Sequence, residues 1–269
     1  MRGKILLGWL TREKAVVFLQ KDCIFNPPLT NEEAEELWAE KRAAVEALNP
    51  RRVPTPAGLE LTPPEREAVE KFLSYMRQQP GGTPHIQGVV KLDPLGLLCR
   101  QLNITLDRAN QYAENVQAAT WSARNCLPTH GALASMRFTR VADGWNVNLP
   151  HREFVFNFNG QAFGVGESAP FVSVSMIGAR AVLWTGNHRG YARMAAANPN
   201  TADRSILAAL VTIGNETVAA DPSLRDLLLG QRPPFLADFL DERLCLDVEL
   251  HRKRYELQIR AEIASIDAD

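Results

Sequence analysis

The sequence predicts an α+β protein, with a helical amino-terminal region over residues 1–128 and a mixed α/β domain over residues 129–269. Capped segments with apolar residues at helical spacing occur before residue 128, whereas period-two alternation dominates after it. The 269 residues are 45% hydrophobic and 23% charged, which is typical of a globular chain that forms one large domain or two ordinary ones.

Two capping boxes mark helix starts in the first half. Thr30 with Glu33 forms the first box, and Thr62 with Glu65 forms the second. In such a box the hydroxyl accepts a backbone N–H three residues on, and the carboxylate accepts the N–H of the cap residue. Further helices are expected after Thr11, as a pair over residues 86–121, and from Asp221 to Leu229.

Alternating apolar residues predict strands in the second half. Residues 137–141 and 145–149 flank an Ala-Asp-Gly turn and therefore predict a hairpin. Further strands are expected over residues 154–158, 171–175, 181–184, 206–213, 244–250 and 255–263.

The segment AVLWTGNHRGYA, residues 181–192, predicts a strand that turns into a helix at Gly186. The start of a helix offers unpaired backbone N–H groups and the positive end of its dipole, which together attract anions. Arg189 adds a forked donor, and His188 adds a donor that switches with pH. We interpret the junction as a phosphate or nucleotide site. A common strand–helix turn with a solvated His-Arg pair remains the alternative.

The order of elements around this junction resembles the ParB/sulfiredoxin-like superfamily, which includes ParB-like nuclease domains. The resemblance is carried by the Pro-led strand over residues 170–174, by Gly178, by the apolar strand over residues 181–184, and by Gly186-Asn187-His188-Arg189-Gly190-Tyr191-Ala192. It covers roughly residues 165–215, in the carboxy-terminal half alone.

The resemblance implies a nucleoside triphosphate bound at Thr185, Gly186, Asn187, His188 and Arg189. Gly186 would let the backbone approach the phosphate, and Arg189 would be the main phosphate ligand. His188 would be a second donor or an acid–base group. Together His188 and Arg189 would be the catalytic residues.

Three departures from the family pattern restrict the activity. Asn187 stands where sulfiredoxins have a cysteine, so their covalent chemistry is excluded. Thr185 stands where several enzymes of the superfamily have an aspartate, which removes an obvious base or metal ligand. Strands, rather than a helix-turn-helix, follow the motif, which disfavours a chromosome-segregation clamp.

Asp238 and Asp241 are spaced to share one face of a short helix, and paired carboxylates suit Mg²⁺. The alternative is a solvated acidic face. The four cysteines are widely spaced without a CxxC pair, which predicts buried free thiols in a reducing compartment.

The chain carries 30 basic and 31 acidic residues, so bulk charge does not favour coating of duplex DNA. No stretch approaches about 18 uninterrupted apolar residues, and no signal peptide is recognised. A cytoplasmic protein without a membrane segment is therefore expected.

Two functions remain open. The first is a nucleotide- or phosphate-binding protein that acts on nucleic acid as a nuclease or hydrolyses a nucleoside triphosphate. The second is a catalytically inactive scaffold or adaptor in a bacterial multiprotein complex, such as a defence system, with the helical half contacting a protein partner.

Overall fold

The computed structural model describes residues 1–49, 58–77, 86–116, 118, 120–127, 137–141, 144–148, 154–158, 163–167, 171–196, 204–212 and 218–251. The chain divides into two units. The first comprises Met1–Thr129 and Pro170–His251, and the second comprises His130–Ala169 and Arg252–Asp269. Helices and mixed sheets together make the protein α+β, as the sequence predicts.

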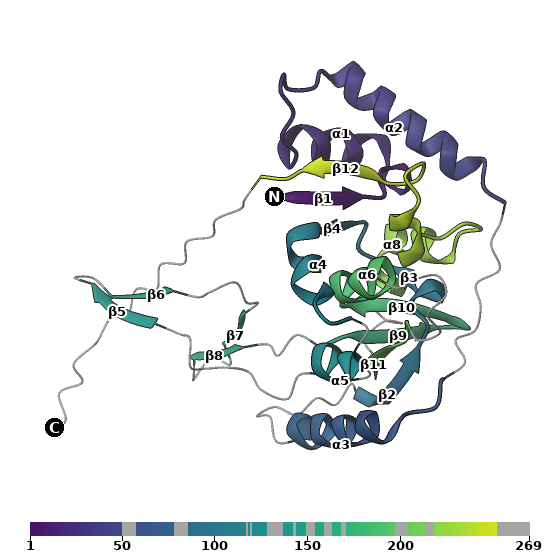
Figure 1. Ribbon diagram of the computed structural model, residues 1–269. Helices are drawn as coiled ribbons and strands as arrows, with labels where there is room; N and C mark the ends of the chain where they lie inside the picture. Colours follow the sequence, from purple (N-terminus) through teal and green to yellow (C-terminus); the bar gives the residue numbers. More distant parts are fainter. Residues whose placement is uncertain are drawn as a thin grey trace. The chain divides into compact units, whose positions relative to one another are not determined.

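A mixed five-stranded sheet forms the centre of the first unit (Figure 1). Its strands, in spatial order, are β2 (Ile86–Leu92), β11 (Ile206–Val211), β9 (Ser173–Ile177), β10 (Arg180–Thr185) and β3 (Leu98–Cys99). Strand β11 runs antiparallel to β2 and parallel to β9. Strand β10 runs antiparallel to β9 and parallel to β3.

This sheet corrects two expectations about the first half of the chain. Residues 86–99 are not helical, because they form β2 and β3. These strands pair with β11 and β10, so a boundary between residues 128 and 129 does not separate two domains. The pairing partners lie far along the chain, and such long-range pairing overrides weak local patterns.

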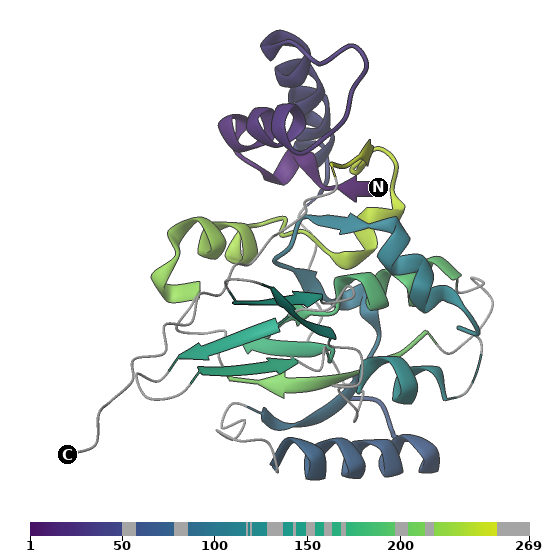
Figure 2. The ribbon, with the colours of Figure 1, turned by 90° about the vertical axis from the view of Figure 1, so that its left-hand side faces the viewer.

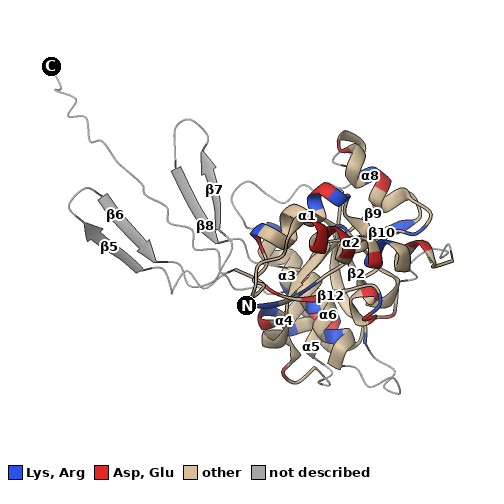
Figure 3. Cartoon of the chain, turned by 90° about the horizontal axis from the view of Figure 1, so that it is seen from above, with Lys and Arg blue, Asp and Glu red and all other residues tan. Residues whose placement is uncertain are grey.

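A smaller antiparallel sheet joins the two ends of the first unit. Its order is β12 (Leu246–Glu249), β1 (Arg2–Ile5) and β4 (Asn103–Thr105). Helices α1 (Arg12–Lys21) and α2 (Asn31–Glu46) lie at this end, after the short helix η1 (Leu7–Trp9). Figure 2 shows α3 (Pro63–Arg77) at the opposite end, beside β2, and Figure 3 shows acidic residues along α2.

The helix starts predicted from local sequence are confirmed. Thr30 accepts the N–H of Glu33 at 3.2 Å while the Glu33 carboxylate accepts the N–H of Thr30 at 2.8 Å. At the start of α8, Oδ1 of Asp221 accepts the backbone N–H groups of Ser223 at 3.0 Å and Leu224 at 3.2 Å. The remaining helices are α4 (Leu106–Ala113), α5 (Trp121–Cys126), α6 (Asn187–Ala196), α8 (Pro222–Leu229), η2 (Pro94–Gly96) and η4 (Leu236–Leu240).

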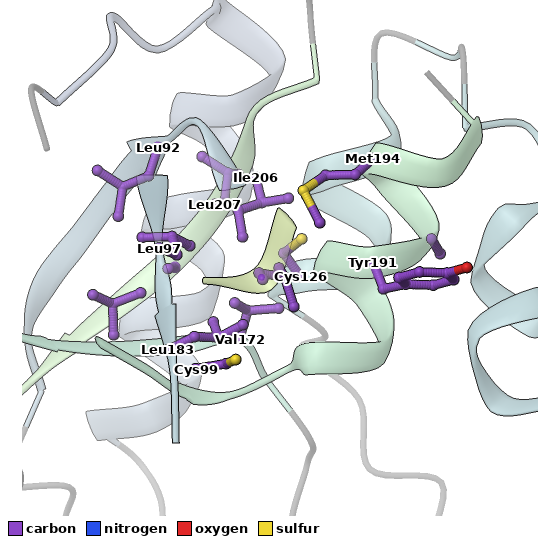
Figure 4. Close-up of a cluster of buried hydrophobic side chains, with 14 of the residues drawn as sticks. Leu92, Leu97, Cys99, Cys126, Val172, Leu183, Tyr191, Met194, Ile206 and Leu207 are labelled. Atoms are coloured by element: carbon purple, nitrogen blue, oxygen red, sulfur yellow. The ribbon is translucent and has the colours of Figure 1, made fainter. Parts of the chain in front are cut away.

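The main core lies between the five-stranded sheet and the helices around it. Figure 4 shows Leu183 from β10 and Val172 just before β9, with Tyr191 and Met194 extending from α6. The same cluster contains Cys126 at the end of α5. All four cysteines are buried and free, which confirms the prediction for their side chains. Helix α6 is therefore fixed to the core along its length.

The second unit contains two hairpins whose backbone pairing is defined. Strands β5 (Arg137–Val141) and β6 (Gly144–Asn148) pair antiparallel, which confirms the hairpin predicted around the Ala-Asp-Gly turn. Strands β7 (Phe154–Phe158) and β8 (Phe163–Glu167) form the other. The strand expected over residues 255–263 lies outside the described residues. Among the residues described here, no helix is both long and apolar enough to cross a membrane.

Candidate anion-binding site

The predicted strand–turn–helix junction is confirmed. Strand β10 ends at Thr185, and α6 begins at Asn187. Gly186 between them has φ 104°, a conformation that side-chain-bearing residues rarely adopt. A Cβ atom at Gly186 would also lie 2.8 Å from Cγ2 of Val172. The turn therefore requires glycine for both its backbone angle and its close approach to Val172, the residue before β9.

The hydroxyl of Thr185 bonds within the sheet. Its Oγ1 donates to the carbonyl of Phe171 at 2.6 Å and lies 2.8 Å from Oγ of Ser173. Because the single Thr185 proton is given to Phe171, Ser173 is the donor in the second contact. Thr185 nevertheless remains exposed at the turn.

Asn187 is buried, with 3% of its surface exposed. Its side-chain amide donates to the carbonyl of Gln101 at 3.0 Å. The contact ties the first residue of α6 to the segment that leads into β4. Asn187 thus positions the helix start and does not present its side chain to solvent.

His188 accepts a hydrogen bond and is held neutral. Its Nε2 accepts the backbone N–H of Thr105 at 3.0 Å, so the proton of the neutral ring resides on Nδ1. Burial lowers the pKa of His188 to about 4, and the positive charges of Arg108 and Arg189 lower it further. Near neutral pH the ring is therefore uncharged, and Nδ1–H is its one donor.

Arg189 is buried, with 7% of its surface exposed, and does not lie on a solvated face. Its guanidinium carbon lies 4.6 Å from the ring centroid of Tyr112 on α4. Its Nε has no hydrogen-bond partner among the described residues, and no carboxylate there lies within ion-pair distance of it. A buried positive charge with an N–H group that makes no hydrogen bond is unfavourable. An anion that accepts this N–H and neutralises the charge would therefore stabilise the guanidinium.

Other cationic groups lie around the same turn. Arg100 donates from Nε to the carbonyl of Trp184 at 3.2 Å, and its guanidinium carbon lies 4.1 Å from the Trp184 ring centroid. Arg108, in the first turn of α4, is close enough to His188 to lower its pKa. The electrostatic environment of the junction is therefore positive.

The two aspartates predicted as metal ligands have other partners. Asp238 is buried, contacts Arg232 at 2.7 Å and accepts the N–H of Phe235 at 2.8 Å. Asp241 contacts Arg243 at 2.6 Å. Within the described ranges, no cluster of three or more metal-ligating residues occurs. The Asp238 carboxylate bonds the start of η4, and the Asp241 carboxylate bonds Arg243 beyond its end. These contacts give no support to a Mg²⁺ site.

The structure brings together residues that sequence reasoning did not connect. Gln101, Thr105 and Tyr112 contact α6 from a segment more than seventy residues earlier in the chain. Arg193, one turn after Arg189, lies with its guanidinium carbon 5.1 Å from the Trp121 ring centroid. The spacing of Arg189 and Arg193 at i and i+4 of the predicted helix is a sequence signal that could have identified Arg193.

Comparison with known proteins gives no relative: no family model, no curated protein and no solved structure matches this chain.

Proposed function

We propose that this protein binds a phosphate-bearing ligand, such as a nucleoside triphosphate or a nucleic-acid phosphate, with Arg189 as the main charged contact. The observation that carries the proposal is the burial of Arg189 without a carboxylate partner among the described residues. Removing an uncompensated charge from water costs several kcal/mol. A bound phosphoryl group would offset that cost and complete the guanidinium's hydrogen bonds.

The surroundings of α6 support a negatively charged ligand. The amino-terminal end of a helix carries a partial positive charge, and α6 begins directly after Gly186. Arg100 and Arg108 add two further positive charges near the junction. Together these groups favour anions over neutral or cationic ligands.

The contacts of His188 favour binding over turnover. A general base needs a free lone pair near the proton it removes, and the Nε2 lone pair of His188 already accepts the Thr105 N–H. We therefore propose a binding module, which agrees better with a nucleotide-binding adaptor than with a nuclease that uses His188 as its base. Protein partners of such an adaptor are part of this proposal.

Calorimetric titration with ATP, CTP, GTP and a short single-stranded DNA, each with and without Mg²⁺, tests the proposal. We expect micromolar binding of at least one of these, weakened at least tenfold in Arg189→Gln because a charged hydrogen bond is lost. The control Arg225→Gln removes the same charge from an exposed position on α8 and leaves the affinity unchanged. Equal binding by all three proteins, or binding by none, contradicts the proposal.

A turnover assay under the same conditions separates the binding module from an enzyme. With the ligand that binds best, we expect no product at saturating concentration, with or without Mg²⁺. Product formation that is lost in His188→Asn would contradict the non-catalytic role.

A further inference from the structure

A stacked arginine–tryptophan pair lies at the surface near the end of β10. The guanidinium carbon of Arg100 lies 4.1 Å from the ring centroid of Trp184, and Nε of Arg100 donates to the Trp184 carbonyl at 3.2 Å. Arg100 is exposed, whereas Trp184 is half-buried. Two contacts therefore fix the orientation of a guanidinium that solvent still reaches.

The strands place this pair next to the start of α6. Strands β3 and β10 run parallel as neighbours, and Arg100 follows β3 directly, beside Trp184 near the end of β10. Asn187, the first residue of α6, donates from its side-chain amide to the carbonyl of Gln101, the residue after Arg100. The stacked pair and the start of α6 therefore adjoin at the carboxyl end of β10.

The Trp184 ring packs on the face of the sheet opposite to α6. It contacts the apolar cluster that contains Val182. The side chain of Leu183 points to the other face, where its Cδ2 lies 3.8 Å from the position that a Cβ atom would take at Gly190 of α6. A ligand that reaches both the stacked pair and the helix start passes over the end of β10, where Thr185 is exposed. In open α/β sheets, ligands likewise bind outside the carboxyl ends of parallel strands.

The Arg100 guanidinium keeps one face for a ligand. The Trp184 ring covers one side of the planar group, and among the described residues no hydrogen bond or ion pair occupies its Nη atoms. Partial burial lowers the pKa of Arg100, and no carboxylate of the described residues opposes this effect. Nucleobases stack on guanidinium planes, and every base has a flat face that can do so. A second flat ring on the outer face of Arg100 would therefore complete the stack.

We propose that the Arg100–Trp184 pair binds the base of a nucleotide, which stacks on the Arg100 guanidinium while its phosphate binds at the start of α6. This inference rests on the phosphate-binding function proposed above and specifies its ligand as a nucleotide. Stacking depends on the area of the ring and not on its edge groups, so purines are preferred over pyrimidines. A free nucleotide and a nucleotide within a single strand share this chemistry, and the experiment distinguishes them.

The test is calorimetric titration of the full chain with tripolyphosphate, ATP, GTP, CTP and a single-stranded oligodeoxyadenylate. The proteins are wild type, Arg100→Lys, Arg189→Gln and the exposed-charge control Arg225→Gln. We expect wild type to bind ATP about fivefold or more tightly than tripolyphosphate, because the base adds a stacking contact. Arg100→Lys keeps the charge without the planar group, so it loses this advantage and keeps tripolyphosphate affinity within about twofold. ATP and GTP should both bind more tightly than CTP, because a purine has the larger face.

The outcomes separate the two proposals. ATP that binds wild type no more tightly than tripolyphosphate, or an ATP advantage that persists in Arg100→Lys, overturns base stacking on Arg100. Tripolyphosphate binding that still depends on Arg189 then leaves the phosphate-binding function intact. Binding of no ligand by wild type overturns both. Equal weakening of ATP and tripolyphosphate in Arg100→Lys assigns Arg100 to a phosphate and also overturns stacking.

The oligonucleotide identifies the source of the base. Tighter binding of the oligonucleotide than of ATP, with the affinity reduced in Arg100→Lys, supports a nucleotide within a strand. Weaker binding of the oligonucleotide, with the ATP advantage lost in Arg100→Lys, supports a free nucleotide. If Arg100→Lys fails to fold by circular dichroism, Arg100→Gln takes its place, and the same loss of the ATP advantage is expected.

Discussion

The backbone N–H of Thr105 donates to Nε2 of His188 across 3.0 Å and joins the start of α4 to the start of α6. These helices come from distant parts of the chain, and the bond sets the protonation state of the histidine at the junction. A neutral, bonded imidazole positions the helix start, while the positive charge of the site comes from arginines.

The first prediction concerns the pH dependence of stability. Because burial lowers the pKa of His188 to about 4 from 6.5, the unfolded chain binds a proton between these values while the folded chain does not. The stabilising contribution of neutral His188 is complete above pH 6.5 and is lost as the pH falls toward 4. We expect the free energy of unfolding to decrease by about 3 kcal/mol over that window. Urea denaturation at several pH values measures it.

His188→Asn supplies the control for this pH effect, because asparagine does not titrate. Subtracting its pH profile from that of wild type should leave a decrease confined to pH 4–6.5. Identical profiles for the two proteins would show that another group is responsible.

The second prediction concerns the glycine at the turn. Gly186→Ala should lower the free energy of unfolding by about 3 kcal/mol, because alanine meets both the positive φ and the side chain of Val172. Gly178→Ala is the matched control: its φ is 59°, and no atom lies within 4 Å of its added Cβ. That substitution should cost about 1 kcal/mol, from the backbone angle alone. Equal costs for the two variants would contradict the close approach at Gly186.

These local features were predictable from the sequence, and their surroundings were not. Two features depend only on residues close together in the chain: the capping box of Thr30 and Glu33, and the turn at Gly186. The local amino-acid sequence is therefore sufficient to identify them. Strand β2 was missed because Gly88 interrupts its apolar alternation and its partner, β11, follows more than one hundred residues later.

The candidate site shows the same limit. The sequence places His188 and Arg189 at a helix start, but it does not show that Gln101 and Thr105 contact that start. Asn187 and Arg189 are buried in the structure, and the sequence does not predict this burial, because tertiary contacts decide exposure. The two predicted donors are a neutral imidazole at His188 and a guanidinium stacked on Tyr112 at Arg189.

The third prediction distinguishes the two aspartates of the η4 region. Asp238→Asn should cost about 3 kcal/mol of unfolding free energy, because it leaves Arg232 without its buried counter-charge. Asp241→Asn should cost less than about 1 kcal/mol, because its partner Arg243 is exposed. Chemical denaturation of both variants measures the difference. Loss of ligand binding in Asp241→Asn, with stability unchanged, would instead restore a role for this carboxylate in the site.

The fourth prediction tests the central claim, that Arg189 is kept as a buried charge for an anionic ligand. The measurement is the free energy of unfolding of wild type and Arg189→Met, each with and without ATP. Without ATP, we expect the variant to be more stable by about 1 kcal/mol, because an uncompensated buried charge is removed. At about one hundred times Kd, ATP should stabilise wild type by about 2.7 kcal/mol and leave the variant unchanged. A variant that is less stable than wild type and equally stabilised by ATP would show that Arg189 serves the fold and not a ligand.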